Sequence, residues 1–174
     1  MARSDLNFCA TCGSALDTRR TEGRQRHYCP NCDRPIYRNP KPCAGVLVVD
    51  SGSVLLIQRT NPPAVGSWSL PAGFLEFDEP PRQAAARELH EETNLTVAPD
   101  SLSLAGTTFI QHSDGQFVLV VVYAVSHAQT DGEVNAGSDA ADARFWEYES
   151  LTPDAPLEPG YRTLCRQVIH DSFE

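Results

Sequence analysis

Two closely spaced cysteine pairs constrain how this chain can fold more than any other feature of its sequence. Cys9 and Cys12 form the first pair and Cys29 and Cys32 the second, with two residues inside each pair. Four thiolates at this spacing complete the closed tetrahedral shell of a structural zinc ion. The polar segment 13–28 between the pairs cannot bury a core of its own, so the metal would supply its folding energy. The spacing therefore predicts a small four-cysteine zinc ribbon, with two disulfides or four free thiols as the alternatives.

Charge and proline content divide the chain into two parts. Residues 1–43 carry a net charge of +4, whereas residues 44–174 carry −13. Three prolines within residues 33–42 indicate a stiff linker. We therefore predict a zinc ribbon with its proline-rich linker over residues 1–42 and a larger domain over residues 43–174. Because an acidic surface repels phosphates, a phosphate-bearing substrate of the larger domain would need cations.

Composition and hydropathy limit the class of protein. The chain has 174 residues, of which 41% are hydrophobic, enough for a packed core. The longest apolar run, residues 117–125, is far shorter than the roughly 20 residues that span a bilayer. Residues 1–9 lack the apolar stretch of a signal peptide. We expect a cytoplasmic protein with no membrane contact.

Turn residues and the spacing of apolar residues predict the elements of the larger domain. Asp78 is a candidate N-cap for its longest helix. The expected elements are a hairpin of strands 44–49 and 54–57, a short strand 68–70, a helix 80–93, a hairpin of strands 104–110 and 117–125 turned at Asp114-Gly115, a strand 143–148 and a helix 161–173. Strands on both sides of one strong helix, followed by a final helix, imply an α/β fold with a mixed sheet covered on both faces.

The helix predicted over 80–93 concentrates acidic side chains on one face. Glu88, Glu91 and Glu92 fall within about a third of its circumference at 100° per residue. Like charges at this spacing repel, and Arg87 alone does not neutralise three carboxylates. Hard divalent cations such as Mg²⁺ or Mn²⁺ would, because they prefer carboxylate oxygens. The alternative is a solvated acidic face.

The residues around this helix extend the pattern. Gly73, Glu79 and the run Arg-Glu-Leu-His-Glu-Glu-Thr-Asn-Leu from Arg87 to Leu95 match eight of the nine specified positions of G-x5-E-x7-R-E-U-x-E-E-x-G-U, where U is aliphatic. This motif is the Nudix box, so the chain resembles the Nudix family. The departure is Asn94, which replaces the second glycine. Asparagine tolerates the left-handed conformation that closes a helix better than other non-glycine residues.

The resemblance implies a Nudix α/β/α sandwich with a mixed sheet, which hydrolyses a nucleoside diphosphate linked to another moiety. Carried over by position, Glu88, Glu91 and Glu92 would be ligands of catalytic Mg²⁺ or Mn²⁺. Glu88 would also orient or deprotonate the attacking water. Arg87 and Glu79 would hold this face of the helix by a salt bridge and hydrogen bonds.

The loop before the helix supplies candidate contacts to metal and substrate. Gly73 and the carbonyl of Ala72 would let the backbone approach the metal and the phosphates closely. Glu76 is a candidate for metal or substrate contact. The aromatic residues that could stack a base or ring are Trp68, Phe74, Phe109 and Tyr123, although an aromatic residue on a strand is core by default.

Later parts of the chain offer fewer signals. Some family members add a metal ligand or base from a loop beyond the box, and the acids available here are Glu133, Asp139 and Asp142. His112, beside the predicted turn of the second hairpin, is given no role because surface histidines are common at turns.

A zinc ribbon ahead of a Nudix domain is similar to two groups of enzymes. One comprises NADH pyrophosphatases with RNA-decapping activity, which carry S-Q-P-W-P-F-P-x-S shortly after the box; residues 96–106 lack this signature. The other acts on ADP-ribose, FAD or related compounds, and segment 66–76 is closer to it. The resemblance therefore favours hydrolysis of ADP-ribose or a dinucleotide such as FAD, with release of AMP.

Two further readings stay open at this point. The ribbon is expected to buttress the domain or to support a homodimer, but its positive charge also suits RNA. In that second reading the Nudix fold would be a non-catalytic nucleotide or RNA sensor. The complete set of box glutamates favours an enzyme, because a binding-only site does not need all of them.

Overall fold

The computed structural model describes residues 6–171 except 63, 113–114, 138, 152–156 and 159. These residues form two compact units that meet in the chain between Pro40 and Lys41. Each unit has its own sheet. Among the described residues, no helix has the length and apolar character needed to cross a membrane.

The first unit is a three-stranded antiparallel sheet. Its strands lie in the order β1 (Asp17–Thr21), β2 (Arg24–Cys29) and β3 (Arg34–Ile36). Glu22 and Gly23, between β1 and β2, both have positive φ angles, 53° and 78°. This pattern is typical of the tight turn that matches the twist of a two-residue hairpin.

The predicted linker over residues 33–42 is wrong at both ends. Residues Arg34–Ile36 form β3, and Lys41 already begins the first strand of the second unit. Pro35 fits in β3 because this strand pairs only with β2 among the described strands, and an edge strand tolerates a residue that has no N–H group. The linker predicted from the proline content is therefore longer than the segment that lies outside the strands.

The second unit is built on one mixed sheet. The main path has the order β10-β5-β4-β9-β8, and β6 and β7 pair with β5 and β4. The strands β4 and β9 run parallel, whereas the other pairs are antiparallel. The strands are β4 (Lys41–Asp50), β5 (Ser53–Arg59), β6 (Trp68–Ser69), β7 (Ala72–Phe74), β8 (Ser103–Gln111), β9 (Phe117–Ser126) and β10 (Ala140–Glu147).

Strand β4 shows why this sheet is covered on both faces. Ala44, Val46 and Val48 belong to one buried cluster, whereas Leu47 and Val49 belong to the other. Successive side chains of a strand point to opposite faces, so a continuous apolar run is buried only between two layers. Both hydrophobic faces of β4 therefore require a covering element.

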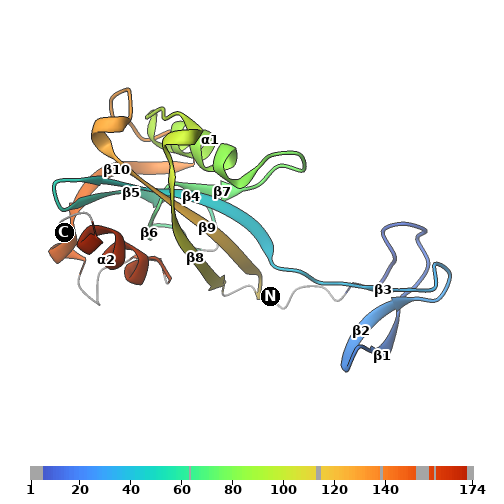
Figure 1. The fold of residues 1–174 in the computed structure, drawn as a ribbon. Coiled ribbons are helices and arrows are strands. Elements are labelled where there is room, and N and C mark those ends of the chain that lie inside the picture. The colour runs from blue at the N-terminus through green and yellow to red at the C-terminus, as the bar shows by residue number, and fades with distance from the viewer. Residues whose placement is uncertain are drawn as a thin grey trace. The chain divides into compact units, whose positions relative to one another are not determined.

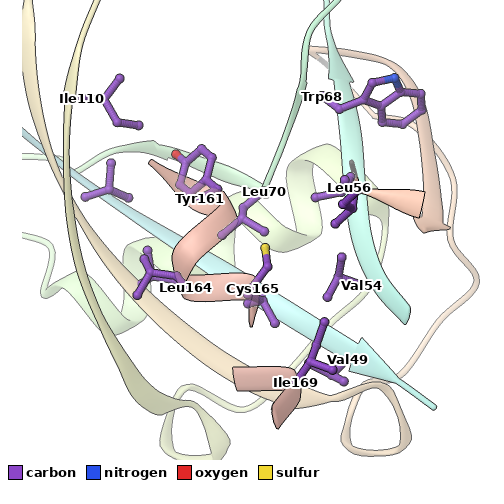
Figure 2. Packing of buried hydrophobic residues seen from close by; sticks show 14 of the residues in the cluster. Val49, Val54, Leu56, Trp68, Leu70, Ile110, Tyr161, Leu164, Cys165 and Ile169 are labelled. Carbon is purple, nitrogen blue, oxygen red and sulfur yellow. The ribbon is translucent and has the colours of Figure 1, made fainter. Parts of the chain in front are cut away.

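Helices supply these two layers (Figure 1). Helix α1 (Pro81–Thr93) packs over one face of the sheet, and helix α2 (Tyr161–Asp171) over the other. Figure 2 shows the α2 side of the core, where Tyr161, Leu164, Cys165 and Ile169 meet the sheet. The predicted α/β/α sandwich with a mixed sheet is confirmed. Short 3₁₀ turns occupy Pro99–Ser101, His127–Gln129 and Tyr148–Ser150.

The ends of α1 differ in how well they were predicted. Asn94 closes the helix in the left-handed region, with φ 62°, as expected from its place in the motif. Asp78 is not the N-cap; Pro80 occupies that position and has no capping side chain. Pro81 follows as the first helical residue, where its fixed φ suits the helix and its missing N–H costs nothing.

Both predicted hairpins and the C-terminal helix are present. The second hairpin turns beside Gly115, whose φ is 79° and whose N–H bonds to the carbonyl of His112 at 2.9 Å. Asp114, the other predicted turn residue, lies outside the described residues, as does the predicted end of the last helix, 172–173.

Candidate active site

A cavity of about 390 Å³ lies in the second unit, between α1, the sheet and the start of α2. It collects side chains from the motif and from segments far away in the sequence. The motif contributes Ala72, Gly73, Phe74, Glu76, Glu88 and Glu92 to its lining.

Arg87 is the centre of a hydrogen-bond network on α1. Its Nε and Nη2 donate to the two carboxylate oxygens of Glu79 at 2.9 and 2.8 Å, a bidentate pair. Its Nη1 donates to Glu88 at 2.6 Å and to Glu91 at 3.2 Å, and its Nη2 also reaches the carbonyl of Phe74 at 3.1 Å. The hydrogen bonds from Arg87 lower the pKa of Glu79. One guanidinium therefore ties the helix to the preceding loop.

Two of the helix carboxylates line the cavity, Glu92 buried and Glu88 half-buried. Glu92 is only 6% exposed, and its carboxylate accepts the N–H of Ala72 at 2.9 Å. Burial raises the pKa of Glu92 to about 8 and also raises the pKa of Glu88. Glu91 is more open, with 47% of its side chain exposed.

Gly73 makes room for one of these carboxylates. A Cβ at this position would lie 2.1 Å from Cδ of Glu88, far inside van der Waals contact. Any larger residue would displace the Glu88 side chain. This close approach explains why the motif has glycine here although the backbone conformation does not demand it.

The donor set suits a hard divalent cation. Carboxylate oxygens such as those of Glu88 and Glu92 are the ligands that Mg²⁺ and Mn²⁺ prefer. Burial raises the pKa of Glu88 and Glu92, so a bound cation would favour their ionised form. The three α1 carboxylates do not converge, since within the described ranges only the four cysteines form a cluster of three or more ligand atoms. Arg87 and the Ala72 N–H bind the glutamate oxygens instead.

A second part of the cavity wall comes from outside the motif. Arg59, His112, Asp139, Glu158 and Tyr161 line it. The sequence pointed to Asp139 as a later acid, but it gave His112 no role and did not single out the other three. Glu158 lies in a loop with no motif, and only the fold brings it to the cavity.

Of the aromatic candidates Phe74, Trp68 and Tyr123, one lines the cavity and two are packed in the core. Phe74 lines the cavity, is 46% exposed and lies under the ammonium group of Lys41 at 4.6 Å. Trp68, labelled in Figure 2, does not line the cavity; it is 5% exposed and meets Trp146 edge-on at 4.9 Å. Packing against this second ring explains its burial. Tyr123 is also in the core, beneath α1.

Three other candidates lie away from the cavity lining. Phe109 stacks on Phe117 at the surface, with ring centroids 5.5 Å apart. The carbonyl of Glu133 accepts a hydrogen bond from the side chain of Asn94. Asp142 pairs with Arg144 at 3.6 Å. Of the three later acids that the sequence offered, Asp139 is therefore the one that lines the cavity.

The four N-terminal cysteines form a separate candidate metal centre. The sulfur atoms of Cys9, Cys12, Cys29 and Cys32 all lie within 4.8 Å of one another. All six cysteines of the chain are free thiols. Hydrogen bonds with Ser14 lower the pKa of Cys12, and the Cys32 N–H points at the sulfur of Cys29 at 3.3 Å. Zinc–sulfur bonds of about 2.3 Å place tetrahedral sulfurs about 3.8 Å apart, so this cluster fits such an ion.

Comparison with known proteins agrees with this geometry. Residues 39–168 match the NUDIX domain family. An ADP-ribose pyrophosphatase from Methanocaldococcus jannaschii is 32% identical over 117 residues, 67% of each chain. The NAD-capped RNA hydrolase NudC of Stutzerimonas stutzeri is 30% identical over 167 residues, which is 95% of this chain but only 55% of that protein.

A solved structure is similar along most of the chain. The crystal structure of a NUDIX hydrolase from Nitrosomonas europaea has a TM-score of 0.66 and 27% identity, and the match covers 94% of this chain and 89% of that one. The family match spans most of the second unit and reaches into α2. The chain therefore belongs to the NUDIX family of hydrolases.

Proposed function

We propose that this hydrolase cleaves the phosphoanhydride bond of a nucleoside diphosphate linked to another moiety, with ADP-ribose or a dinucleotide such as FAD as substrate. The observation that carries the proposal is a pair of cavity carboxylates, the half-buried Glu88 and the buried Glu92, held against Gly73 and Ala72. Buried carboxylates with raised pKa values in a cavity are typical of a catalytic site.

Each motif residue has a defined task in this proposal. Glu88, Glu91 and Glu92, with the carbonyl of Ala72, would hold Mg²⁺ or Mn²⁺. The bound ion would supply charge neutralisation of the diphosphate and a lowered pKa for its coordinated water. Glu88 orients the attacking water or accepts its proton, while Arg87 fixes the position of Glu88.

The reaction is a hydrolysis that needs no other reactant. Water attacks one phosphorus and the bond from that phosphorus to the bridging oxygen breaks. The attacked phosphate gains the oxygen of the water, and the leaving phosphate keeps the bridging oxygen. From ADP-ribose the products are AMP and ribose 5-phosphate. Glu79 supports Arg87 through the bidentate pair. Phe74 and Glu76 line the cavity and are proposed to contact the substrate, with Phe74 offering an exposed ring.

The names of two relatives point to different substrates. The M. jannaschii relative is named for ADP-ribose, whereas the S. stutzeri relative is named for NAD-capped RNA. The latter is matched over little more than half of its length. The missing signature after the box favours ADP-ribose or FAD over NADH and capped RNA.

The cysteine cluster is proposed to hold structural zinc. The first unit, up to Pro40, would form the ribbon and its connection, and the second unit, from Lys41, the Nudix domain. A closed set of four thiolates leaves no ligand position for substrate, so the role of this zinc is to fold the ribbon.

A substrate panel tests the proposal. The protein is incubated with Mg²⁺ or Mn²⁺ and, in parallel, ADP-ribose, FAD, NADH or capped RNA, and the products are separated by chromatography. AMP from ADP-ribose or FAD is the expected result. Preferential cleavage of NADH or capped RNA would replace the substrate assignment, and no cleavage of any substrate would favour a nucleotide sensor.

A further inference from the structure

The cavity holds a buried acid that the proposed chemistry does not use. Glu158 is 4% exposed, and its carboxylate lies 3.6 Å from Nδ1 of His112 and 4.0 Å from Nη1 of Arg59. Both separations are longer than a direct hydrogen bond. Nε of Arg59 is also buried and has no hydrogen-bond partner among the described residues.

Main-chain hydrogen bonds to two adjacent residues hold Glu158 and Arg59 in place. The N–H of Glu158 donates to the carbonyl of Trp68 at 2.8 Å, and the N–H of Arg59 donates to the carbonyl of Ser67 at 3.0 Å. His112 directly follows β8. Among the described residues no group donates a direct hydrogen bond to the Glu158 carboxylate, which is costly for a buried acid, and the cavity gives a bonding partner access to it.

The chemistry of the three groups restricts this partner. Glu158 accepts hydrogen bonds, Arg59 donates them, and His112 can do either according to its tautomer. A phosphate would be repelled by Glu158, and an ammonium group would be repelled by Arg59. A hydroxyl group satisfies both, because it donates to the carboxylate and accepts from the guanidinium or imidazole.

We propose that Glu158, His112 and Arg59 form a subsite for a ribose diol of the substrate. Acidic side chains bind ribose hydroxyls in the same way in dinucleotide-binding folds. The inference rests on the proposed function, because nucleotide substrates carry such a diol. The diol belongs either to the nucleoside or to the second ribose of a compound such as ADP-ribose, and the chemistry of recognition is the same for both.

Calorimetric binding of two pairs of probes tests the subsite. AMP and 2′,3′-dideoxy-AMP report on the ribose of the nucleoside, and ribose 5-phosphate and 2-deoxyribose 5-phosphate report on the second ribose. None contains a phosphoanhydride bond, so Mg²⁺ can be present without turnover. We expect the wild type to bind one diol probe about tenfold more tightly than its deoxy counterpart, and Glu158→Gln to abolish this ratio.

Control variants separate the subsite from general effects. Glu147→Gln also removes one carboxylate, but from an exposed position on β10, and should retain the wild-type ratio. His112→Gln should reduce the ratio and decides the question if Glu158→Gln does not fold. A wild type without preference in either pair, or an unchanged ratio in the variants, would overturn the subsite. Failed hydrolysis with an intact ratio would overturn the proposed function alone.

Discussion

At the scale of single residues, Gly73 is the position where the smallest change should have the largest effect on activity. The methyl group of Gly73→Ala would lie 2.1 Å from Cδ of Glu88, so the carboxylate must move. A displacement of about 1 Å at a reacting group costs on the order of 100-fold in rate. We expect a loss of that size in kcat with little change in the melting temperature. Turnover within about twofold of wild type would contradict this placement of Glu88.

The buried carboxylate of Glu92 should make the metal-free protein sensitive to pH. Burial raises its pKa from 4.5 to about 8, so between these values the folded state holds a proton that the unfolded state has lost. The stability that this group contributes is therefore fully present below pH 4.5 and is lost as the pH rises through about 8. We expect the melting temperature in EDTA to fall by roughly 5 °C or more between about pH 5 and about pH 9.

Glu92→Gln removes the titrating group and should flatten this pH dependence. Melting curves of both proteins over the same range provide the comparison. Mg²⁺ added at the alkaline end of the range should restore part of the wild-type stability, because it binds the ionised carboxylates of the folded state. An equal fall in the wild type and in Glu92→Gln would show that another group controls the pH dependence.

At the scale of elements, the position of α1 depends on one arginine. Arg87→Gln leaves Glu79 and Glu88 without their main cationic partner in a half-buried site, and we expect a loss of about 1–3 kcal/mol in the free energy of unfolding. Arg82→Gln is the matched control on the same helix. The ion pair of Arg82 with Asp100 is 3.9 Å long and exposed, so this substitution should lower the free energy of unfolding by less than about 0.5 kcal/mol. Urea unfolding gives the free energy of unfolding of both variants. An equal loss in Arg87→Gln and Arg82→Gln would refute the anchoring role of Arg87.

The elements also show what the sequence could and could not reveal. The helix, its left-handed end at Asn94 and both hairpins follow local rules of spacing and turn chemistry, which act over a few residues. Asp78 failed as a cap because the two prolines after it set the start of α1. The strand β3 was missed because an edge position, which only pairing creates, made Pro35 acceptable.

The candidate site also has a part that local sequence patterns predict and a part that only the fold brings together. The motif residues share one loop and one helix. Spacing alone predicted that Arg87 pairs with Glu91, whereas the bond from Arg87 to Glu79 was expected from the family resemblance. Glu158 and Arg59 come together with His112 only through β5, β6 and the segment before α2, and no local pattern encodes that contact. Trp68 is the converse case, since its burial against Trp146 depends on a strand far later in the chain.

At the scale of the whole molecule, the two units should respond differently to loss of metal. We expect the first unit to depend on metal at its cysteine cluster, whereas the second unit has two hydrophobic clusters of its own. A strong zinc chelator should therefore unfold the first unit only. Trypsin should then cleave rapidly at the arginines of β1 and β2. Emission from Trp68 and Trp146, both in the second unit, should stay unchanged, and a red shift on chelation would contradict the independence of its fold.

The central claim is that the α1 glutamates hydrolyse a phosphoanhydride bond, and single-residue comparison of turnover tests it most directly. AMP formation from ADP-ribose with Mg²⁺ is measured for wild type, Glu92→Gln and the exposed control Glu147→Gln at equal concentrations of folded protein. The account predicts a loss of several orders of magnitude in kcat for Glu92→Gln and wild-type turnover for Glu147→Gln. Turnover that survives in Glu92→Gln would place the chemistry elsewhere in the molecule.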